Sequence, residues 1–429
     1  MSDLGQAISF ASSLYRQRVG TYYAGYVARD PLALLRLRPG RVDPYSIYER
    51  MREEGPLAPT RLGNWVSTNH RVCNAVLRDR RLGTRPSEQD GADLQDGVDF
   101  SFLGMNPPDH TRLRRLVQPV FSPKTMASYQ DRIERTVGDL LDRASAAGEF
   151  DFVSAFAAPL PIAVITDLLG IPDADTERFA RHGALIGGAL DGIRSLRHAA
   201  ALQASDAELR RLFEDLFELR RREPQDDIVS RLVGAEGDQI EAREMQPLCG
   251  LLLVAGFETT VNLLGNAVLA LLSHPEQWEI LRADPAGMAP KAVEEALRFD
   301  PPVQLTSRVA LEPLELEGTA VEKGKLVVTL IGAANRDPEV YERPDTFDIQ
   351  REGAADHLAF SSGIHYCVGQ PLARLEATIA LRMLAERMPN LARTGAVRRR
   401  NSTTIRGPIR IPMTAGSPVR VAPHYAHPA

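Results

Sequence analysis

Hydrophobic residues recur mainly at helical spacing along this chain. Between residues 127 and 237 the pattern is almost wholly helical, and it predicts an amphipathic helix with Ile133, Val137 and Leu140 on one face. Further along, 246–273 reads as a long helix that is apolar on nearly every side. These periods predict a mostly α fold with a small β-rich part.

Two expected helices, over 178–186 and 199–221, flank a joint at 187–194 that contains glycine. We expect this joint to be flexible. The segment 86–99 is polar and acidic and has no apolar period, which is typical of a mobile loop.

The remaining elements are short. Strands are expected at 60–68, 303–309 and 326–331, and a hairpin at 403–412. Short helices are expected near Pro44, over 69–80 and over 332–337.

Composition and charge narrow the class of protein. The 429 residues have an ordinary globular composition, and the formal net charge of -5 argues against a general nucleic-acid binder. Cys73, Cys249 and Cys367 are too few for a disulfide framework, which fits a reducing cytoplasm. The most apolar stretch, 248–257, is interrupted by Glu258, so we expect a soluble protein without a membrane span.

One cysteine lies in a segment flanked by glycines. Between Phe360 and Gly369 the chain reads as a loop in which Gly363 and Gly369 lie on either side of Cys367. A helix is expected to follow, with Glu376 on a face other than the apolar one. The thiol would lie just ahead of the helix N-terminus, where N–H groups and the helix dipole favour a thiolate. A lone cysteine is more often a small buried hydrophobe, so the flanking residues decide between the two readings.

Those flanking residues, Phe-x-x-Gly-x-His-x-Cys-x-Gly, resemble the haem-binding loop of the cytochrome P450 family of haem-thiolate monooxygenases. In that family the cysteine, here Cys367, is the axial iron ligand. The resemblance also places Phe360, His365 and Gly369 next to the cofactor, which is haem b (iron protoporphyrin IX). The family usually has glycine directly after the phenylalanine, where this chain has Ser361.

The long apolar helix contains Ala-Gly-Phe-Glu-Thr-Thr at 255–260. A carboxylate and two hydroxyls in such a run are costly without partners, and a threonine there can bond the carbonyl of Ala255. Taken alone, such threonines are more often helix-packing residues. The run resembles the family's acid–alcohol motif, which implies that Thr259 hydrogen-bonds the bound dioxygen and that Glu258 helps to relay protons. Ala255 would contact the haem.

A basic helix follows Pro-Pro-Asp at 107–109. His110 and Arg114 are four residues apart and share a face. A basic helix is most often just a solvated face. Here it resembles the family's helix whose histidine and arginine bind the haem propionates, and Arg308 and His365 resemble further propionate ligands.

Other charged residues receive simpler interpretations. Asp109 is expected to be the N-cap of the basic helix. Arg112 and Arg115 point elsewhere, and the resemblance places them near the surface that attracts an acidic electron-transfer partner. The basic run 398–400 is interpreted as a solvated surface.

Glu295 and Arg298 are one helical turn apart. As an exposed pair they would contribute only a few tenths of a kcal/mol. They resemble the family's buried Glu-x-x-Arg, with Arg351 as the third member. The resemblance implies that this triad holds the cysteine loop in place.

The substrate pocket is expected to draw on scattered side chains, which set its size more than the identity of the substrate. By resemblance the residues facing it are Leu251, Val254, Ala255, Gln304, Leu305, Thr404 and Ile405. The joint at 187–194 and the loop at 86–99 would cover it.

The resemblance covers about residues 40–415 and includes four motifs in the family's order. It implies the single-domain cytochrome P450 fold over 41–415, an N-terminal extension over 1–40 and a C-terminal tail over 416–429. The implied function is insertion of one oxygen atom from O2 into a small organic substrate of secondary metabolism, by hydroxylation or epoxidation. Ferredoxin and ferredoxin reductase would supply two electrons. We expect a cytoplasmic monomer that binds neither nucleic acid nor membrane.

Two other functions stay open. A peroxygenase would use hydrogen peroxide directly, although Glu258 and Thr259 argue against it. A non-catalytic haem protein would sense a gas or dock a carrier-bound substrate. The sequence does not specify the substrate.

Overall fold

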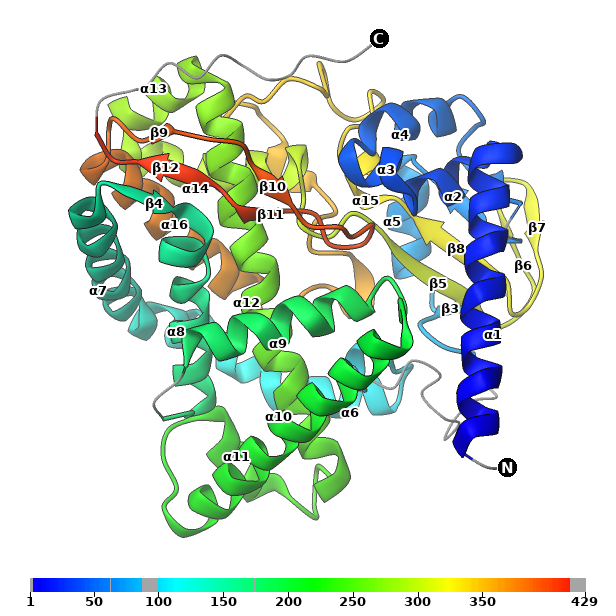
Figure 1. Ribbon diagram of the computed structural model, residues 1–429, viewed down its shortest axis with the longest axis horizontal. Helices are drawn as coiled ribbons and strands as arrows, with labels where there is room; N and C mark the ends of the chain where they lie inside the picture. Colours follow the sequence, from blue (N-terminus) through cyan, green and yellow to red (C-terminus); the bar gives the residue numbers. More distant parts are fainter. Residues whose placement is uncertain (1–2, 62, 87–98, 173–174, 417–429) are drawn as a thin grey trace.

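The computed structural model describes residues 3–61, 63–86, 99–172 and 175–416, and it is built mainly of helices (Figure 1). The helices are α1 (Asp3–Tyr22), α2 (Pro31–Leu35), α3 (Arg38–Val42), α4 (Tyr45–Arg52), α5 (His70–Arg78), α6 (Asp109–Val117), α7 (Pro123–Ala147), α8 (Pro159–Leu169), α9 (Thr176–Ala189), α10 (Leu196–Arg222), α11 (Ile228–Ala235), α12 (Ala242–Ser273), α13 (Pro275–Ala283), α14 (Pro285–Phe299), α15 (Ile331–Ala334) and α16 (Gln370–Arg387). The strands are β1 (Ala58–Pro59), β2 (Trp65–Ser67), β3 (Leu82–Gly83), β4 (Glu149–Asp151), β5 (Thr306–Ala310), β6 (Leu314–Leu316), β7 (Thr319–Val321), β8 (Leu326–Thr329), β9 (Ala392–Arg393), β10 (Arg398–Arg399), β11 (Pro408–Arg410) and β12 (Pro412–Thr414). The predicted fold class, mostly α with a small β-rich part, is confirmed.

Helix α12 runs through the middle of the helical part and packs against α8, α9, α14 and α16. It begins four residues earlier than predicted, because Glu241 and Glu244 form a capping box ahead of the apolar run. Its length and apolar composition would suffice to cross a bilayer, but 78% of its most apolar window is buried inside the protein. Helix α12 is thus the core helix of the fold.

The β-rich part is a five-stranded sheet in the order β1-β2-β8-β5-β3, next to helices α4, α5 and α15. Strands β2 and β8 pair in parallel, with Trp65 opposite Val327, and the other pairs are antiparallel. The strands predicted from the sequence are present as β2, β5 and β8, each shorter than expected.

The C-terminal segment forms a hairpin from β10 and β11, and β12 pairs with β4 and β9. The hairpin expected at 403–412 is therefore displaced. Its loop is 400–407, and this loop lies beside the joint between α9 and α10 in Figure 1.

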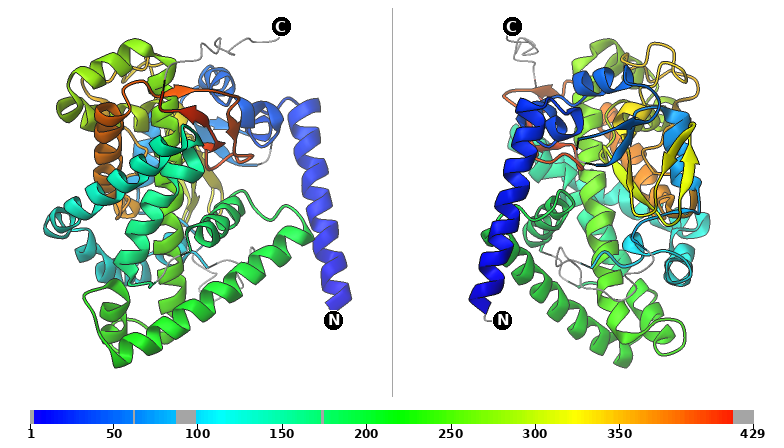
Figure 2. Two further views of the ribbon diagram at one scale, coloured as in Figure 1. Left: turned by 60° about the vertical axis from the view of Figure 1, so that its left-hand side comes forward. Right: turned by 90° about the vertical axis from the view of Figure 1, so that its right-hand side faces the viewer.

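The joint between α9 and α10 is 190–195, shorter than predicted because α9 continues through its glycines. An earlier glycine of α9 lets this helix lie close on α12, since a Cβ at Gly183 would be 2.2 Å from the Phe257 ring. Helix α1 stands on the outside of the molecule (Figure 2), and the Arg18 guanidinium donates a hydrogen bond to the Arg194 carbonyl in the joint. The loop expected at 86–99 falls almost entirely outside the described residues.

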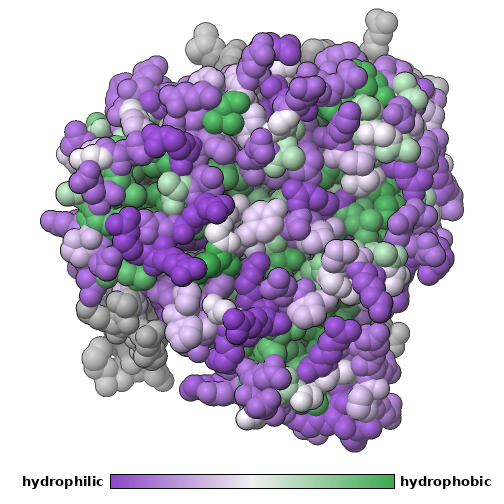
Figure 3. All heavy atoms as spheres, turned by 180° about the vertical axis from the view of Figure 1, so that it is seen from behind, coloured by the Kyte–Doolittle hydropathy of each residue, from purple (hydrophilic) through white to green (hydrophobic). Residues whose placement is uncertain are grey.

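The face opposite to the view of Figure 1 is largely hydrophilic. Its hydrophobic side chains form small groups that hydrophilic residues separate (Figure 3).

Candidate active site

The cysteine loop is held from both sides. The Cys367 backbone N–H donates to the Phe360 carbonyl at 2.9 Å, which closes the loop on itself. The Arg374 guanidinium lies 4.5 Å from the centroid of the Phe360 ring, a cation–π contact. Gly363 has φ +68, and a Cβ there would be 2.5 Å from the Leu77 carbonyl oxygen, so only glycine fits against α5.

Cys367 lies just before α16. Its side chain has exposed surface, although many protein atoms surround the thiol. Burial raises the pKa of the thiol, while the N–H groups of Gly369 and Gln370 and the charge of Arg114 lower it. The net shift is upward because burial outweighs the N–H groups at the start of α16, which act in the predicted direction. Binding an electron-accepting metal would supply the missing stabilisation by displacing the proton.

Four nitrogen donors gather beside the cysteine loop: His110 and Arg114 from α6, Arg308 from β5, and His365. The centroids of the His110 and His365 rings are 4.2 Å apart. Burial and the neighbouring charges lower the pKa of His110 to about 4 and that of His365 to about 3. Burial also lowers the pKa of Arg308 to about 10.

These donors lack anionic partners within the described chain. His110 is buried with neither ring nitrogen hydrogen-bonded, and Arg308, also buried, donates only to the hydroxyl of Thr306 and the carbonyl of Ser307. Arg114 donates to the Tyr366 carbonyl and to no described carboxylate. Buried cationic donors without counter-charges are unfavourable, and the two propionates of haem b would supply those charges.

A single cysteine ligand suits an iron that a macrocycle already holds. No group of three or more His, Cys, Asp or Glu side chains is arranged to hold a metal ion among the residues described here. Cys367 would thus be a single soft ligand next to a cluster of donors that suits carboxylates. That combination matches haem b rather than a metal bound by protein ligands alone.

The structure corrects two expectations for α6. Asp109 is the first helical residue and does not cap, since the N-cap position is Pro108. Arg112 is not a free surface charge, because its guanidinium pairs with Glu244 of α12 at 2.6 Å and with Asp109 at 3.0 Å. Arg115 is exposed, as expected.

One face of α12 opens in the middle of the buried helix. Ala255 is exposed although residues 251–254 directly before it are buried, and the partly buried Thr259 follows one turn later. The Thr259 hydroxyl donates to the Ala255 carbonyl at 3.0 Å, as predicted. No residue of the helix departs from α geometry, so this bond does not break the helix. A small residue and a hydroxyl on an accessible strip suit a site for a small ligand.

Glu258 lies on a different face of α12 from Thr259, and its carboxylate has a partner that the sequence did not predict. Its carboxylate Oε1 is 2.5 Å from Arg400 Nη2, and both side chains are nearly buried. The expectation that 398–400 is a solvated surface is therefore wrong for Arg400. It is also wrong for Arg399, whose guanidinium is 3.4 Å from the Asn266 amide oxygen. Only Arg398 is exposed.

Glu295 and Arg298 are fully buried and joined by two hydrogen bonds of 2.8 Å. Arg351 approaches the same carboxylate at 3.3 Å, and Arg298 also donates to the carbonyls of Asn335, Pro344 and Thr346. The triad is present as the sequence predicted, and it ties α14 to the long loop that leads to the cysteine.

The sequence did not predict the surroundings of two carboxyl groups near the cysteine loop. Glu294 bonds Arg374 of α16 at 2.5 Å and His357 at 3.3 Å. Burial raises the pKa of Glu294, but His357 and Arg374 outweigh it and bring that pKa to about 2. Glu376, expected on a polar face, is buried with both oxygens unpartnered, and burial raises its pKa well above the ordinary value. The role of Glu294 could have been predicted from the sequence, because Glu294 directly precedes Glu295.

The expected pocket residues fall into two groups. Leu251, Val254 and Ile405 are buried, and Leu305 is partly buried. Gln304 is buried but not available to a substrate, since its amide accepts from the Tyr48 hydroxyl at 3.1 Å and donates to the Pro301 carbonyl at 2.8 Å. The backbone N–H of Thr404 is bound to Asp191 in the joint. Gln304 thus has a structural role.

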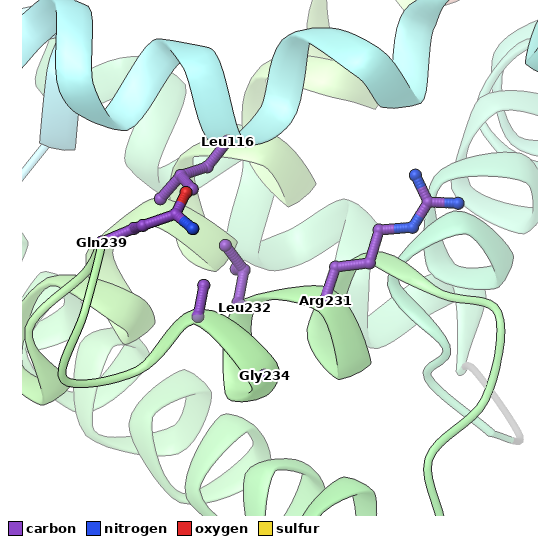
Figure 4. Close-up of a pocket in the computed structure, with 6 residues that line it drawn as sticks. Leu116, Arg231, Leu232, Gly234 and Gln239 are labelled. Atoms are coloured by element: carbon purple, nitrogen blue, oxygen red, sulfur yellow. The ribbon is translucent and has the colours of Figure 1, made fainter.

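Two hollows lie away from these residues. One of about 390 Å³ lies between α6 and α11, where Leu116, Leu232 and Gln239 turn toward one another and Arg231 turns away (Figure 4). The other, of about 600 Å³, lies between α10 and the first turns of α12 and has a charged lining. Neither includes a residue from the clusters described above.

Comparison with known proteins identifies the family of this chain. The family model for cytochrome P450 matches residues 288–388. The chain is 38% identical over 400 residues to the putative cytochrome P450 140 of Mycobacterium tuberculosis, covering 87% of this chain and 89% of that protein. It is 37% identical over 375 residues to the 6-deoxyerythronolide B hydroxylase of Saccharopolyspora erythraea, covering 82% and 90%.

A solved structure of a related protein has the same fold as this chain. The P450BioI structure, in complex with an acyl carrier protein bearing hexadec-9Z-enoic acid, superposes with a TM-score of 0.82 at 37% identity. The superposition covers 88% of this chain and 100% of that one. Haem b is the cofactor of this family. The chain belongs to the cytochrome P450 family and is an oxidoreductase of the P450 monooxygenase class.

Proposed function

We propose that this protein hydroxylates or epoxidises a small, largely apolar organic substrate of secondary metabolism. It would use O2 and two electrons from a ferredoxin and its reductase. The observation that carries the proposal is the accessible strip of Ala255 and Thr259 within the buried helix α12. An accessible hydroxyl surrounded by apolar side chains suits proton delivery to a site that excludes bulk water.

The roles of the residues follow from their chemistry. Bound haem would supply oxygen activation at its iron. Cys367 would ligate that iron, and His110, Arg114, Arg308 and His365 would bind the two propionates with charge-assisted hydrogen bonds.

The distal side would be built from α12. Thr259 would hold and pass a proton at its hydroxyl, and Glu258 would bring protons from solvent. Leu251, Val254 and Ile405 would bound the substrate with apolar surface.

Related proteins support the substrate class. Similar chains include the P450 monooxygenase PikC and 6-deoxyerythronolide B hydroxylase, and similar structures include a P450 named for a bacillaene polyketide synthase. The P450BioI structure with an acyl carrier protein supports a carrier-bound substrate as a second form. We propose a cytoplasmic protein that acts on either a free or a carrier-bound substrate of this apolar kind.

We also propose that the catalytic domain excludes the first helix. Helix α1 stands apart in Figure 2, and the P450BioI structure is matched over its whole length by only 88% of this chain. Leu32 and Leu35 are buried with Ile47 and Tyr48, which puts the boundary nearer residue 30 than residue 40.

The test has two stages. The reduced, carbon-monoxide-bound protein should have the spectrum of a thiolate-ligated haem, and Cys367→Ser should lose it while Cys249→Ser keeps it. Compounds that shift the haem spin state are then incubated with ferredoxin, its reductase, NADPH and 18O2. We expect one labelled oxygen atom in the product.

The alternatives give different results. Equal turnover with hydrogen peroxide and no need for the electron-transfer proteins would make the protein a peroxygenase. A haem-loaded protein in which no compound shifts the spectrum and no product forms would be a non-catalytic haem protein, contrary to the proposal.

A further inference from the structure

The carboxylate of Glu258 is clamped by a residue that is distant in sequence. Arg400 Nη2 is 2.5 Å from Glu258 Oε1, and the two side chains are 12% and 6% exposed. The backbone N–H of Arg400 donates to the Gly407 carbonyl at 3.0 Å, so the hairpin loop itself fixes the arginine. Removing one member of such a nearly buried pair leaves the other charge uncompensated.

The clamp holds the carboxylate against α9. A Cβ at Gly183 would be 3.1 Å from Glu258 Oε2, and a Cβ at Gly187 would be 3.2 Å from Glu258 Cγ. A side chain at either position would crowd Glu258, so the two glycines of α9 leave room for its side chain. Successive residues of a helix point about 100° apart, so Thr259 faces a different side of α12.

The same hairpin loop also holds the joint between α9 and α10. The backbone N–H groups of Thr403 and Thr404 donate to the Asp191 carboxylate at 3.1 Å and 2.9 Å. Asp191 lies in the joint and also pairs with Arg194 at 3.2 Å. In Figure 1 this loop, in red, lies directly beside the joint.

Arg400 and Thr403 are three residues apart in one loop, and their partners lie on α12 and next to α9. We infer that Arg400 is a positioning residue for Glu258, and that the loop 400–404 couples the position of this acid to the closure of the α9–α10 joint. The inference rests on the proposed proton-delivery role of Glu258. With the joint closed, Glu258 is held as a carboxylate between Arg400 and α9. When the Asp191 contacts release and α9 lifts, the carboxylate is free to turn.

The proton transfer itself balances without any further reactant. The Glu258 carboxylate accepts a proton from solvent on the side of the joint. The resulting carboxyl then turns and passes that proton toward the Thr259 hydroxyl on a different face of α12, and the carboxylate returns to Arg400. Burial raises the pKa of Glu258, and Arg400 lowers it, so loss of the arginine favours the protonated acid.

The first experiment needs no turnover. Infrared difference spectra of resting, haem-loaded Arg400→Gln against wild type should show a new band of a protonated carboxylic acid. The band should be absent from the Arg400→Gln, Glu258→Gln double variant. Hydrogen exchange should also accelerate in 183–195, both in Arg400→Gln and in Asp191→Asn. Arg398→Gln removes an exposed arginine of the same run and should match wild type in both measurements.

The second experiment measures coupling, the product formed per NADPH consumed. Arg400→Gln should lower it by about tenfold with an unchanged substrate-induced spin shift, and Arg400→Lys should recover part of it. A carboxylate that stays ionised in Arg400→Gln, together with unchanged exchange in 183–195, would overturn the inference. If no electron donor supports product formation, the proposed function fails, while the infrared and exchange results still decide the role of Arg400.

Discussion

Glu295 and Arg298 form a two-bonded ion pair in which neither side chain has any exposed surface. The two residues are one helical turn apart in α14. Their other hydrogen bonds all go to the loop that follows α15. Asp348 donates its backbone N–H to the same Glu295 carboxylate at 2.9 Å. A local pair thus organises a long segment of mostly irregular structure, and that segment ends at the cysteine loop.

Glu295→Ala should yield protein that contains little haem. The substitution strands the buried Arg298 charge, which costs about 3 kcal/mol or more, and releases the loop before the cysteine. The measurement is the ratio of haem to protein in purified material. Glu322→Ala serves as the control, since its contact with Lys325 is exposed and 4.0 Å long. A soluble Glu295→Ala protein with full haem content would contradict the role of the triad.

Ser361→Gly should stabilise the protein. Ser361 has φ +64, a left-handed conformation that costs a non-glycine residue about 1 kcal/mol, and its buried hydroxyl has no hydrogen-bond partner. We expect a higher midpoint of thermal unfolding for the haem-loaded variant. Gly363→Ala, two residues away, should have the opposite effect because its Cβ would collide with the Leu77 carbonyl. Equal midpoints for Ser361→Gly and wild type would show that the loop relieves this strain elsewhere.

Thr259→Ala should consume NADPH at a rate close to that of wild type but form less product and more hydrogen peroxide. The variant removes the accessible hydroxyl on α12 and keeps the helix. Peroxide and product are measured against NADPH consumed. Thr260→Ala is the matched control, because Thr260 is buried and its hydroxyl bonds the Gly256 carbonyl at 3.3 Å. Unchanged coupling in Thr259→Ala would place the proton path elsewhere.

The haem-free protein should lose stability as the pH falls below about 6.5, the ordinary pKa of histidine. The pKa of His110 is about 4 in the fold, so the unfolded chain binds the proton first. The stability from a neutral, buried His110 is complete above pH 6.5, and about 1 kcal/mol of it is gone by pH 5.5. Haem should weaken this dependence, since its propionates favour a protonated imidazole.

The measurement for this prediction is the unfolding midpoint of haem-free and haem-loaded protein at pH 7.5, 6.5 and 5.5. His110→Gln should weaken the pH dependence of the haem-free form, and the part that remains would include that of His365. Identical pH dependence of the two forms in wild type would argue against propionates at His110.

Much of the site could be read from the sequence because its signals are local. The spacing of Gly363, His365 and Cys367 and the i, i+4 pair of His110 and Arg114 depend only on residues that are neighbours along the chain. Helix α12 was evident from its apolar period, and the mostly helical fold class followed from many such periods.

The errors came from charges whose partners are distant in sequence. Arg112 and Arg400 looked like solvated residues, but each has a carboxylate partner on α12. Glu376 looked like part of a polar helix face, yet α16 is packed on several sides, and Glu376 lies on one of the covered sides. Sequence pattern assigns polarity to a helix face, but it does not say how many neighbours cover the helix.

The sequence by itself determined which residues can ligate a haem and which helix carries the acid and the alcohol, because those features lie within one or two helical turns. Only the tertiary structure decided where Glu258 points and what holds it there. An ion pair between α12 and the C-terminal hairpin depends on how the chain brings distant residues together, and no local period encodes that contact.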